Sequence, residues 1–171
     1  MWKYRIALAL VTALAVSVAL WAPAASALQK PRTFSLLEVG RTQAPLGDFT
    51  FDRAPVGGDR FTETSDLYRW AGGTSKGAHV GRDRVLLTFI TGYGANFTHR
   101  ATILVNGQMF LPDGTLMIEG YGSVPPNGPH RFKLPVVGGT GVYNNARGYI
   151  TTRGLGNGTT GRTKIDFYLL P

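Results

Sequence analysis

Hydrophobic and polar residues alternate along much of the chain, and the clearest case lies near its C-terminal end. There Ile165, Phe167 and Leu169 are separated from one another by single polar or amphipathic residues. A period of two places one set of side chains on a core and the other toward water or a lumen, as in a β-strand. No stretch after residue 31 shows a convincing 3.6-residue period of an amphipathic helix. The pattern therefore predicts an all-β protein.

Eight segments have this strand-like character, and turn residues separate them. The predicted strands cover residues 33–39, 60–70, 85–91, 100–111, 115–121, 131–137, 143–153 and 162–170. Eight antiparallel strands close into a barrel with room for one small ligand, although a sandwich of two sheets fits the same count. The Gly138–Gly141 cluster suits a tight reversal between two strands, because glycine tolerates positive φ.

Composition narrows the prediction to a single small domain. The chain has 171 residues, of which 23 are glycine and 10 are proline, and it has no cysteine. A sequence without cysteine excludes a disulfide framework, a thiolate metal site and a cysteine nucleophile. One domain, residues 28–171, must therefore rely on its core and on a hydrogen-bonded ladder that a closed barrel completes.

The first 27 residues predict a signal peptide that is not part of the fold. Lys3 and Arg5 form a short basic start, residues 6–21 are almost continuously apolar, and residues 25–27 read Ala-Ser-Ala. We expect cleavage after Ala27, secretion of the mature chain and no stable membrane anchor afterwards; an uncleaved anchor is the alternative. Cleavage removes two basic residues, which lowers the formal net charge from +8 to +6.

Three segments resemble the dirigent and allene oxide cyclase families. The strongest begins as Pro-Val-Val-Gly-Gly-Thr-Gly at 135–141 and continues as Ala-Arg-Gly-Tyr at 146–149, close to the dirigent pattern. Residues 110–114, Phe-Leu-Pro-Asp-Gly, are similar to a hairpin of small exported relatives of the cyclase. A weaker match begins with Leu-Glu-Val at 37–39. Together the three segments extend the resemblance over nearly the whole mature chain.

That resemblance implies an antiparallel eight-stranded barrel, dimeric or trimeric in many members, with a mostly apolar lumen. Allene oxide cyclases close a ring in a reactive epoxide, and dirigent proteins hold radical or quinone-methide species so that coupling gives one stereoisomer. Confinement is the shared principle, because the pocket selects the conformer that reacts. The implied function is stereoselective cyclisation or coupling of an apolar reactive molecule without a cofactor. A non-catalytic carrier or sensor of hydrophobic small molecules is the alternative.

The resemblance also implies two candidate catalytic residues. Glu38 lies where allene oxide cyclases carry a first-strand glutamate that steers the reacting cation, and an apolar lumen would raise the pKa of such a carboxyl. Arg147 matches the arginine of the dirigent Ala-Arg-Gly segment and would anchor a carboxylate, enolate or carbonyl oxygen. The two-residue alternation of the first strand does not show whether Glu38 faces the lumen or the solvent. A structural role for Arg147 is equally open. Asn144 and Asn145 replace bulkier dirigent residues, which argues against a lignan-type substrate.

Several tyrosines and one further acid are candidates for lining a substrate pocket, because a tyrosine combines an apolar ring with one polar group. The candidate substrate-binding residues are Tyr68, Tyr93, Glu119, Tyr121 and Tyr149. Positions in the barrel core, at its rim or on its outer face are the alternatives. A cavity below roughly 300 Å³ would leave little room for a drug-sized guest and would favour a structural barrel with a filled lumen.

Other functional classes find little support in the sequence. His79, His99 and His130 are far apart and lack the spacing of metal ligands, so no metal site is predicted. The arginines are dispersed, and aromatic residues are not interleaved with them as in a nucleic-acid-binding module. The basic balance therefore predicts a solubilising exterior, with no nucleic-acid partner.

Overall fold

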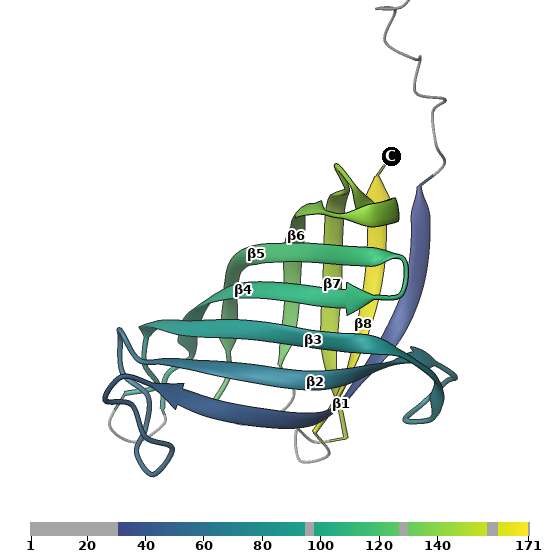
Figure 1. Ribbon diagram of the computed structural model, residues 1–171. Coiled ribbons are helices and arrows are strands. Elements are labelled where there is room, and N and C mark those ends of the chain that lie inside the picture. Colours follow the sequence, from purple (N-terminus) through teal and green to yellow (C-terminus); the bar gives the residue numbers. More distant parts are fainter. Residues whose placement is uncertain (1–30, 95–97, 127–129, 157–160, 171) are drawn as a thin grey trace, which may run out of the picture.

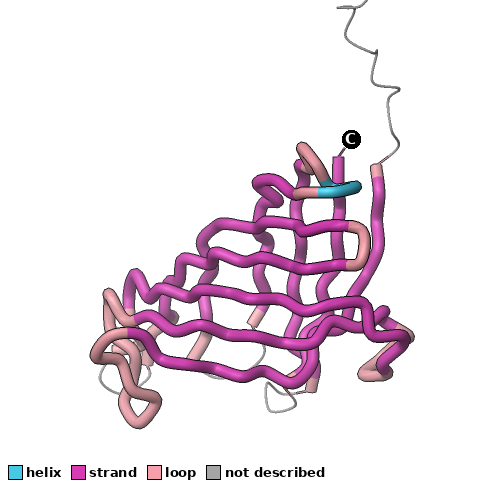
Figure 2. Tube along the Cα trace, viewed as in Figure 1, coloured by secondary structure: helices cyan, strands magenta, loops and turns pink. Residues whose placement is uncertain are grey.

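The computed structural model describes residues 31–94, 98–126, 130–156 and 161–170, which form one closed barrel (Figures 1 and 2). Each strand pairs antiparallel with its sequence neighbours, and β8 closes the ring on β1. The strands are β1 (Arg32–Leu46), β2 (Arg60–Trp70), β3 (Lys76–Thr91), β4 (Ala101–Leu111), β5 (Gly114–Val124), β6 (Arg131–Gly139), β7 (Arg147–Leu155) and β8 (Arg162–Leu170). The predicted eight-stranded barrel is confirmed, whereas the predicted signal peptide lies outside the described residues.

The connection between β6 and β7 is longer than the predicted tight reversal. A short 3-10 helix, η1 (Gly141–Tyr143), follows β6, and β7 begins at Arg147, so the strand predicted to begin at residue 143 is wrong at its start. Gly141 has a φ of 61° and Asn145 a φ of 60°, and both lie in the left-handed region that favours glycine and asparagine. The glycine cluster therefore makes a helical turn between the strands.

Two strands extend furthest beyond the bounds that the hydrophobic pattern predicts. β1 continues to Leu46 and β3 begins at Lys76, although residues 76–84 are mostly polar, basic or glycine. Both extensions pair with β2 along their length. Hydrogen bonding to a neighbouring strand maintains these segments even where alternation is weak, because strand formation depends strongly on tertiary context.

Apolar side chains fill the half of the barrel that lies next to η1. The buried inward residues of this half are Leu36, Leu67, Leu116, Val136, Phe167 and Leu169. Tyr143 and Ala146, from the β6–β7 connection, join the same cluster and cover that end of the barrel. Burial of this apolar surface is the main force that closes the ring of strands.

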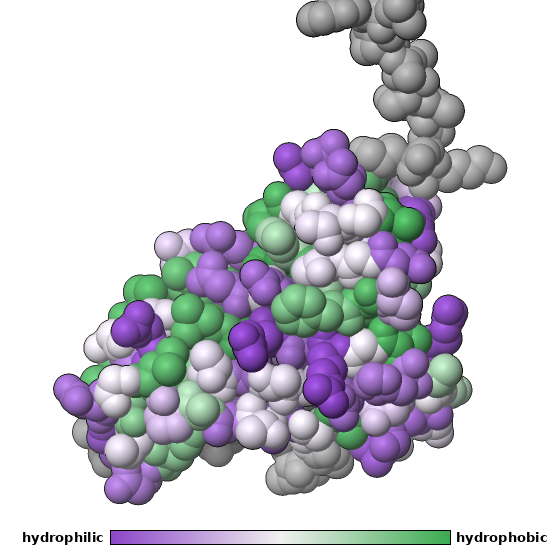
Figure 3. Space-filling model, viewed as in Figure 1, coloured by the Kyte–Doolittle hydropathy of each residue, from purple (hydrophilic) through white to green (hydrophobic). Residues whose placement is uncertain are grey.

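The outer surface is mixed in character. On the face shown in Figure 3, hydrophilic and hydrophobic side chains alternate over β1–β5 with no broad apolar area. Exposed apolar residues such as Phe110 and Val137 come from different strands. Among the described residues, no helix has the length and apolar character needed to cross a bilayer.

Candidate functional site

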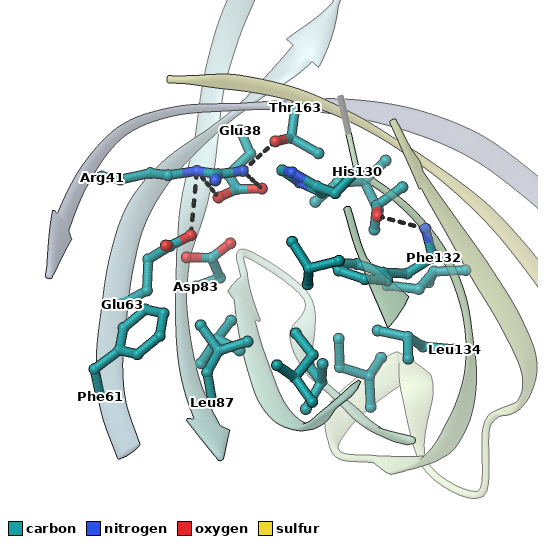
Figure 4. A pocket seen from close by; sticks show the side chains of 18 of the residues that line it. Glu38, Arg41, Phe61, Glu63, Asp83, Leu87, His130, Phe132, Leu134 and Thr163 are labelled. Atoms are coloured by element: carbon teal, nitrogen blue, oxygen red, sulfur yellow. Dashed lines mark hydrogen bonds and ion pairs between the residues drawn. The ribbon is translucent and has the colours of Figure 1, made fainter. Parts of the chain in front are cut away.

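A cavity of about 180 Å³ lies in the barrel interior, beyond the apolar cluster next to η1. Its apolar lining comes from β2–β8, whose lining side chains point inward by the two-residue period of each strand. Apolar lining residues of these strands include Leu87, Val105, Ile118, Leu134, Ile150 and Ile165. The lining carboxyl groups and the lining arginine come from β1–β3 (Figure 4). The opposite walls of the cavity therefore differ in chemistry.

A β-bulge in β1 determines which charged side chains enter the cavity. The pairing of β1 with β2 shifts register between Val39 and Thr42, and Gly40, inside the bulge, has a φ of 75°. Glu38 points inward before the bulge, and Arg41 points inward after it. Strict alternation from Glu38 would have turned Arg41 outward, so the bulge brings its guanidinium beside the Glu38 carboxyl group.

Arg41 lies at the centre of a buried charge cluster. Its Nε is 3.0 Å from Oε1 of Glu38 and 3.1 Å from Oε1 of Glu63. Its Nη2 donates a hydrogen bond to the Thr163 hydroxyl and another, of 3.4 Å, to Glu38. The Ser65 hydroxyl donates to Glu38 over 3.1 Å. These contacts fix the guanidinium and the Glu38 carboxyl group in one geometry, because buried charged groups need partners where water is excluded.

Asp83 is the third carboxyl group of this cluster and is only 2% exposed. It accepts a hydrogen bond of 2.9 Å from the backbone N–H of Ser65. Within the described residues, no basic side chain forms an ion pair with Asp83. Burial, reinforced by the charges of Glu38 and Glu63, raises the pKa of Asp83 to about 8.

Glu38 is 6% exposed, and its pKa is also displaced. Burial raises the pKa of Glu38 to about 7, although the Arg41 guanidinium acts in the opposite direction. Two carboxyl groups of one cavity wall therefore exchange protons near neutral pH. A group that titrates near the working pH is effective as an acid or a base.

His130 lies on the other side of the cavity from Glu63 and Asp83 (Figure 4). Its ring stacks on Phe132, with ring centroids 5.2 Å apart and an interplanar angle of 25°. Burial and the positive charge of Arg41 lower the pKa of His130, so its imidazole is neutral at neutral pH. The described residues contain no group of three or more His, Cys, Asp or Glu side chains that could hold a metal ion.

Aromatic rings cover the cavity near the connection between β1 and β2. Phe49, from that connection, is buried and packs against Phe61 and Phe89 with centroid distances of 6.2 and 6.5 Å. Tyr93 lies edge-on to Phe89 at 6.0 Å, and burial raises the pKa of the Tyr93 phenol. Phe61, Phe89 and Tyr93 all line the cavity. A guest in the cavity therefore contacts several aromatic side chains as well as the carboxyl groups.

Gly122, in β5, makes room for the Phe132 ring that lines the cavity, and its substitution tests how tightly this ring is packed. A Cβ atom on Gly122 would lie 2.4 Å from Cδ1 of Phe132, so Gly122→Ala requires the ring to move. We expect this variant to lose about 1–3 kcal/mol of unfolding free energy, as overpacking usually does. Gly138→Ala is the matched control, because a Cβ atom there meets nothing within 4 Å. Urea unfolding compares the two, and equal stability would show that the ring relaxes without strain.

Two of the seven sequence-predicted site residues, Glu38 and Tyr93, line the cavity. The other five do not line it, and these are Tyr68, Glu119, Tyr121, Tyr149 and Arg147. The structure places these five candidates outside the cavity, in alternative positions that the sequence had left open, whereas the catalytic role of Glu38 stays a prediction.

Strand alternation explains where the tyrosines and the second acid lie. Glu119 and Tyr121 alternate with the inward Ile118, and Tyr121 is 68% exposed. Tyr149 directly precedes the inward Ile150 and stacks on another tyrosine of the outer face, with ring centroids 5.2 Å apart. Tyr68 directly follows the inward Leu67. Each of these side chains therefore points away from the lumen.

Arg147 is exposed and binds backbone atoms of its own hairpin. It donates hydrogen bonds to the carbonyl oxygens of Val137, at 3.2 Å, and Ala146, at 3.0 Å. These bonds support the reversal between β6 and β7. The arginine that enters the cavity is Arg41, which was not predicted from the sequence.

The sequence contained a usable signal for two of the missed acids. Phe61 and Leu67 share one face of β2, and Glu63 falls on the same face by the two-residue period. Asp83 has the same parity as the inward Val85, but it lies before the segment that was predicted to be a strand. A sharper use of parity would have placed both carboxyl groups inside the barrel.

No protein-family model matches the chain, and no curated protein matches its sequence. Solved structures match its fold. Pyocyanin demethylase superimposes with a TM-score of 0.54 at 19% identity, covering 81% of this chain and 98% of that one. The pterocarpan synthase dirigent protein PsPTS1 superimposes with a TM-score of 0.56 at 17% sequence identity, and the match covers 82% of this chain and 92% of that one. The exo-specific intermolecular Diels-Alderase AbnU superimposes with a TM-score of 0.51 at 15% sequence identity, and the match covers 81% of this chain and 98% of that one. The resemblance predicted from the sequence is therefore confirmed for the fold, which this chain shares with a dirigent protein and a Diels-Alderase.

Proposed function

We propose that the protein is an exported barrel that encloses the reacting part of one small, largely apolar molecule and directs its stereoselective cyclisation or coupling. The observation that carries this proposal is the buried carboxyl cluster in one wall of an otherwise largely apolar cavity. The shared fold of a pterocarpan synthase dirigent protein and a Diels-Alderase supports it. The leader predicted at residues 1–27 is the ground for export.

The size of the cavity limits how much of the guest it encloses. Its volume of about 180 Å³ is below the roughly 300 Å³ at which drug-sized ligands begin to fit. An engineered apolar cavity of about 150 Å³ nevertheless binds benzene. The enclosed part of the guest is therefore about one substituted ring, and any remaining part extends out of the cavity.

The two walls of the cavity have different roles in this proposal. Contacts with the apolar wall hold the guest in one folded conformer, which removes rotational freedom before bonds form. The ionised Glu38 carboxylate stabilises positive charge that develops on the guest, and Arg41 and Ser65 keep that carboxylate in place. Exclusion of water strengthens this interaction. A cyclisation of a reactive molecule in such a site needs no cofactor.

The stereochemical outcome of a confined reaction tests the proposal. A linear trienone, which closes two rings by intramolecular cycloaddition, gives racemic product when no chiral surface is present. We expect a measurable enantiomeric excess in the presence of the protein, determined by chiral chromatography. Val105→Phe, which fills the cavity, should return racemic product, whereas Val137→Phe on the outer face should leave the selectivity unchanged.

The same experiment distinguishes a catalyst from a non-catalytic carrier. Reversible binding of the trienone with racemic product would support the alternative, a non-catalytic carrier or sensor of hydrophobic small molecules. Failure to bind either the trienone or toluene would contradict a neutral apolar guest. Titration followed by changes in the NMR signals of the lumen methyl groups measures this binding independently of turnover.

A further inference from the structure

The acidic and basic groups of the cavity are unequal in number. Glu38, Glu63 and Asp83 contribute three carboxyl groups, one from each of three adjacent strands, β1, β2 and β3. Of the described residues that line the cavity, only Arg41 has a permanent positive charge. Arg41 pairs with Glu38 and Glu63, whereas Asp83 has a backbone N–H as its hydrogen-bond donor. The cavity therefore has carboxyl groups that its own arginine does not neutralise.

We propose that the guest of this cavity is a flat organic cation of about one ring, whose positive charge completes the charge balance of the carboxyl cluster. The inference uses the same cavity as the proposed function and specifies the chemical class of its guest. A pyridinium, an aromatic iminium or a protonated heteroaromatic ring belongs to this class.

The geometry of the lining fits such a guest. Phe61, Phe89 and Phe132 line the cavity together with Asp83, so one ring-sized guest meets aromatic side chains and a carboxyl group together. Aromatic faces attract cations, and the attraction strengthens where water is excluded. The volume of about 180 Å³ admits a single substituted ring. Arg41 is held by Thr163 and by two carboxylates, which places its charge on the β1 side of the cluster.

Binding of a cation should be linked to the release of protons. The titratable or charged groups that face the cavity are Glu38 and Arg41 from β1, Glu63 from β2, Asp83 from β3, Tyr93 after β3 and His130 before β6. Burial keeps protons on Glu38 and Asp83 near neutral pH, and it keeps His130 without an added proton. A cation beside the carboxyl groups favours their ionised form. Its affinity should therefore rise with pH through the range in which they titrate.

A neutral guest with a hydrogen-bond acceptor would show the opposite behaviour. The protonated carboxyl group of Asp83 would donate to such an acceptor, and this donor is lost as the pH rises. The sign of the pH dependence therefore distinguishes a cation from a neutral acceptor, and a purely apolar guest should show little dependence.

Three probes of similar size make the test. N-methylpyridinium chloride is the cation, pyridine N-oxide is the neutral acceptor and toluene is the apolar reference, each titrated into the purified protein by calorimetry. We expect N-methylpyridinium to bind about tenfold more tightly at pH 8 than at pH 6 and to release protons, seen as a buffer-dependent heat. Tighter binding of pyridine N-oxide, or binding of N-methylpyridinium no stronger than that of toluene at pH 8, would overturn the inference.

Substitution of the carboxyl groups localises the effect. Asp83→Asn should weaken N-methylpyridinium binding about tenfold or more at pH 8 and reduce its pH dependence, with a smaller effect on toluene binding. Glu38→Gln provides a second variant of the same kind if Asp83→Asn folds poorly. Asp66→Asn is the matched control, because the Asp66 carboxylate pairs with Arg82 on the outer face. Equal cation binding by Asp83→Asn, Glu38→Gln and Asp66→Asn would contradict the proposal.

These measurements record binding and do not depend on turnover. Cation binding together with racemic product from the trienone would sustain the guest class and contradict the cyclisation of a neutral guest. Stereoselective product without cation binding would sustain the cyclisation and contradict the guest class.

Discussion

Arg41→Met should destabilise the protein by about 3–5 kcal/mol at neutral pH, which is the usual cost of removing one partner from a buried ion pair. The substitution leaves Glu38 and Glu63 in the barrel without the guanidinium that lies 3.0 and 3.1 Å from them. Methionine retains most of the apolar volume of the arginine side chain. The loss of unfolding free energy therefore comes mainly from removal of the positive charge. Urea unfolding at neutral pH measures it.

A second arginine provides the control for this effect. Arg82 has a side chain that is 71% exposed and lies 3.2 Å from Asp66, so Arg82→Met should cost no more than about 1 kcal/mol. Adding Glu38→Gln to Arg41→Met should recover part of the lost stability, because it removes one unpaired buried charge. If Arg41→Met costs no more than Arg82→Met, then water or other groups already solvate the carboxyl cluster.

The fold was predictable because its signals are local and repeated. Alternation of the kind seen at Ile165 and Phe167 reports which side of a strand faces the core, and eight such segments leave few ways to arrange a small chain. The glycine-rich segment at 135–141 indicated a reversal at the correct place. Its detailed shape was not predictable, because η1 depends on how residues 140–146 pack against the barrel end.

The candidate site was less predictable, because it depends on register. The family resemblance suggested both Glu38 and Arg147, but the lumen accepts only one side of each strand. A β-bulge at Gly40 reverses the expected orientation of Arg41, and the alternation of residues along β1 does not predict this bulge. The sequence thus offered Glu38 as a candidate without deciding that it faces the lumen, and its arginine partner required the backbone geometry.

The protein should also lose several kcal/mol of stability as the pH rises from about 5 to about 8. The folded-state pKa values of Glu38 and Asp83, about 7 and about 8, exceed the ordinary values of 4.5 and 3.8 for these side chains. Between these limits the native state binds more protons than the unfolded state, so raising the pH favours unfolding. This contribution is fully present below the unfolded-state pKa values and is lost as the pH passes the folded-state values.

Other carboxyl groups should not mask this trend. The hydrogen bond from Arg53 lowers the pKa of Asp59, so its contribution to stability is lost only in more acidic solution, below the usual aspartate pKa of about 4. Thermal and urea unfolding at several pH values between about 4 and 9 should therefore show a maximum near pH 5. Stability that is constant or rising between pH 5 and pH 8 would mean that the lumen carboxyl groups are already ionised.

Neutral substitutions connect this trend to the proposed guest. The double variant Glu38→Gln with Asp83→Asn should no longer lose stability as the pH rises in this range, and it should be more stable than the natural chain at about pH 8, because it no longer ionises these two buried groups. N-methylpyridinium should stabilise the natural chain more at high pH than at low pH, since its charge offsets the ionised carboxylates. The double variant should lack this response. A barrel that is least stable when its lumen is ionised and empty gains most from a cation, so instability and ligand preference have one physical cause.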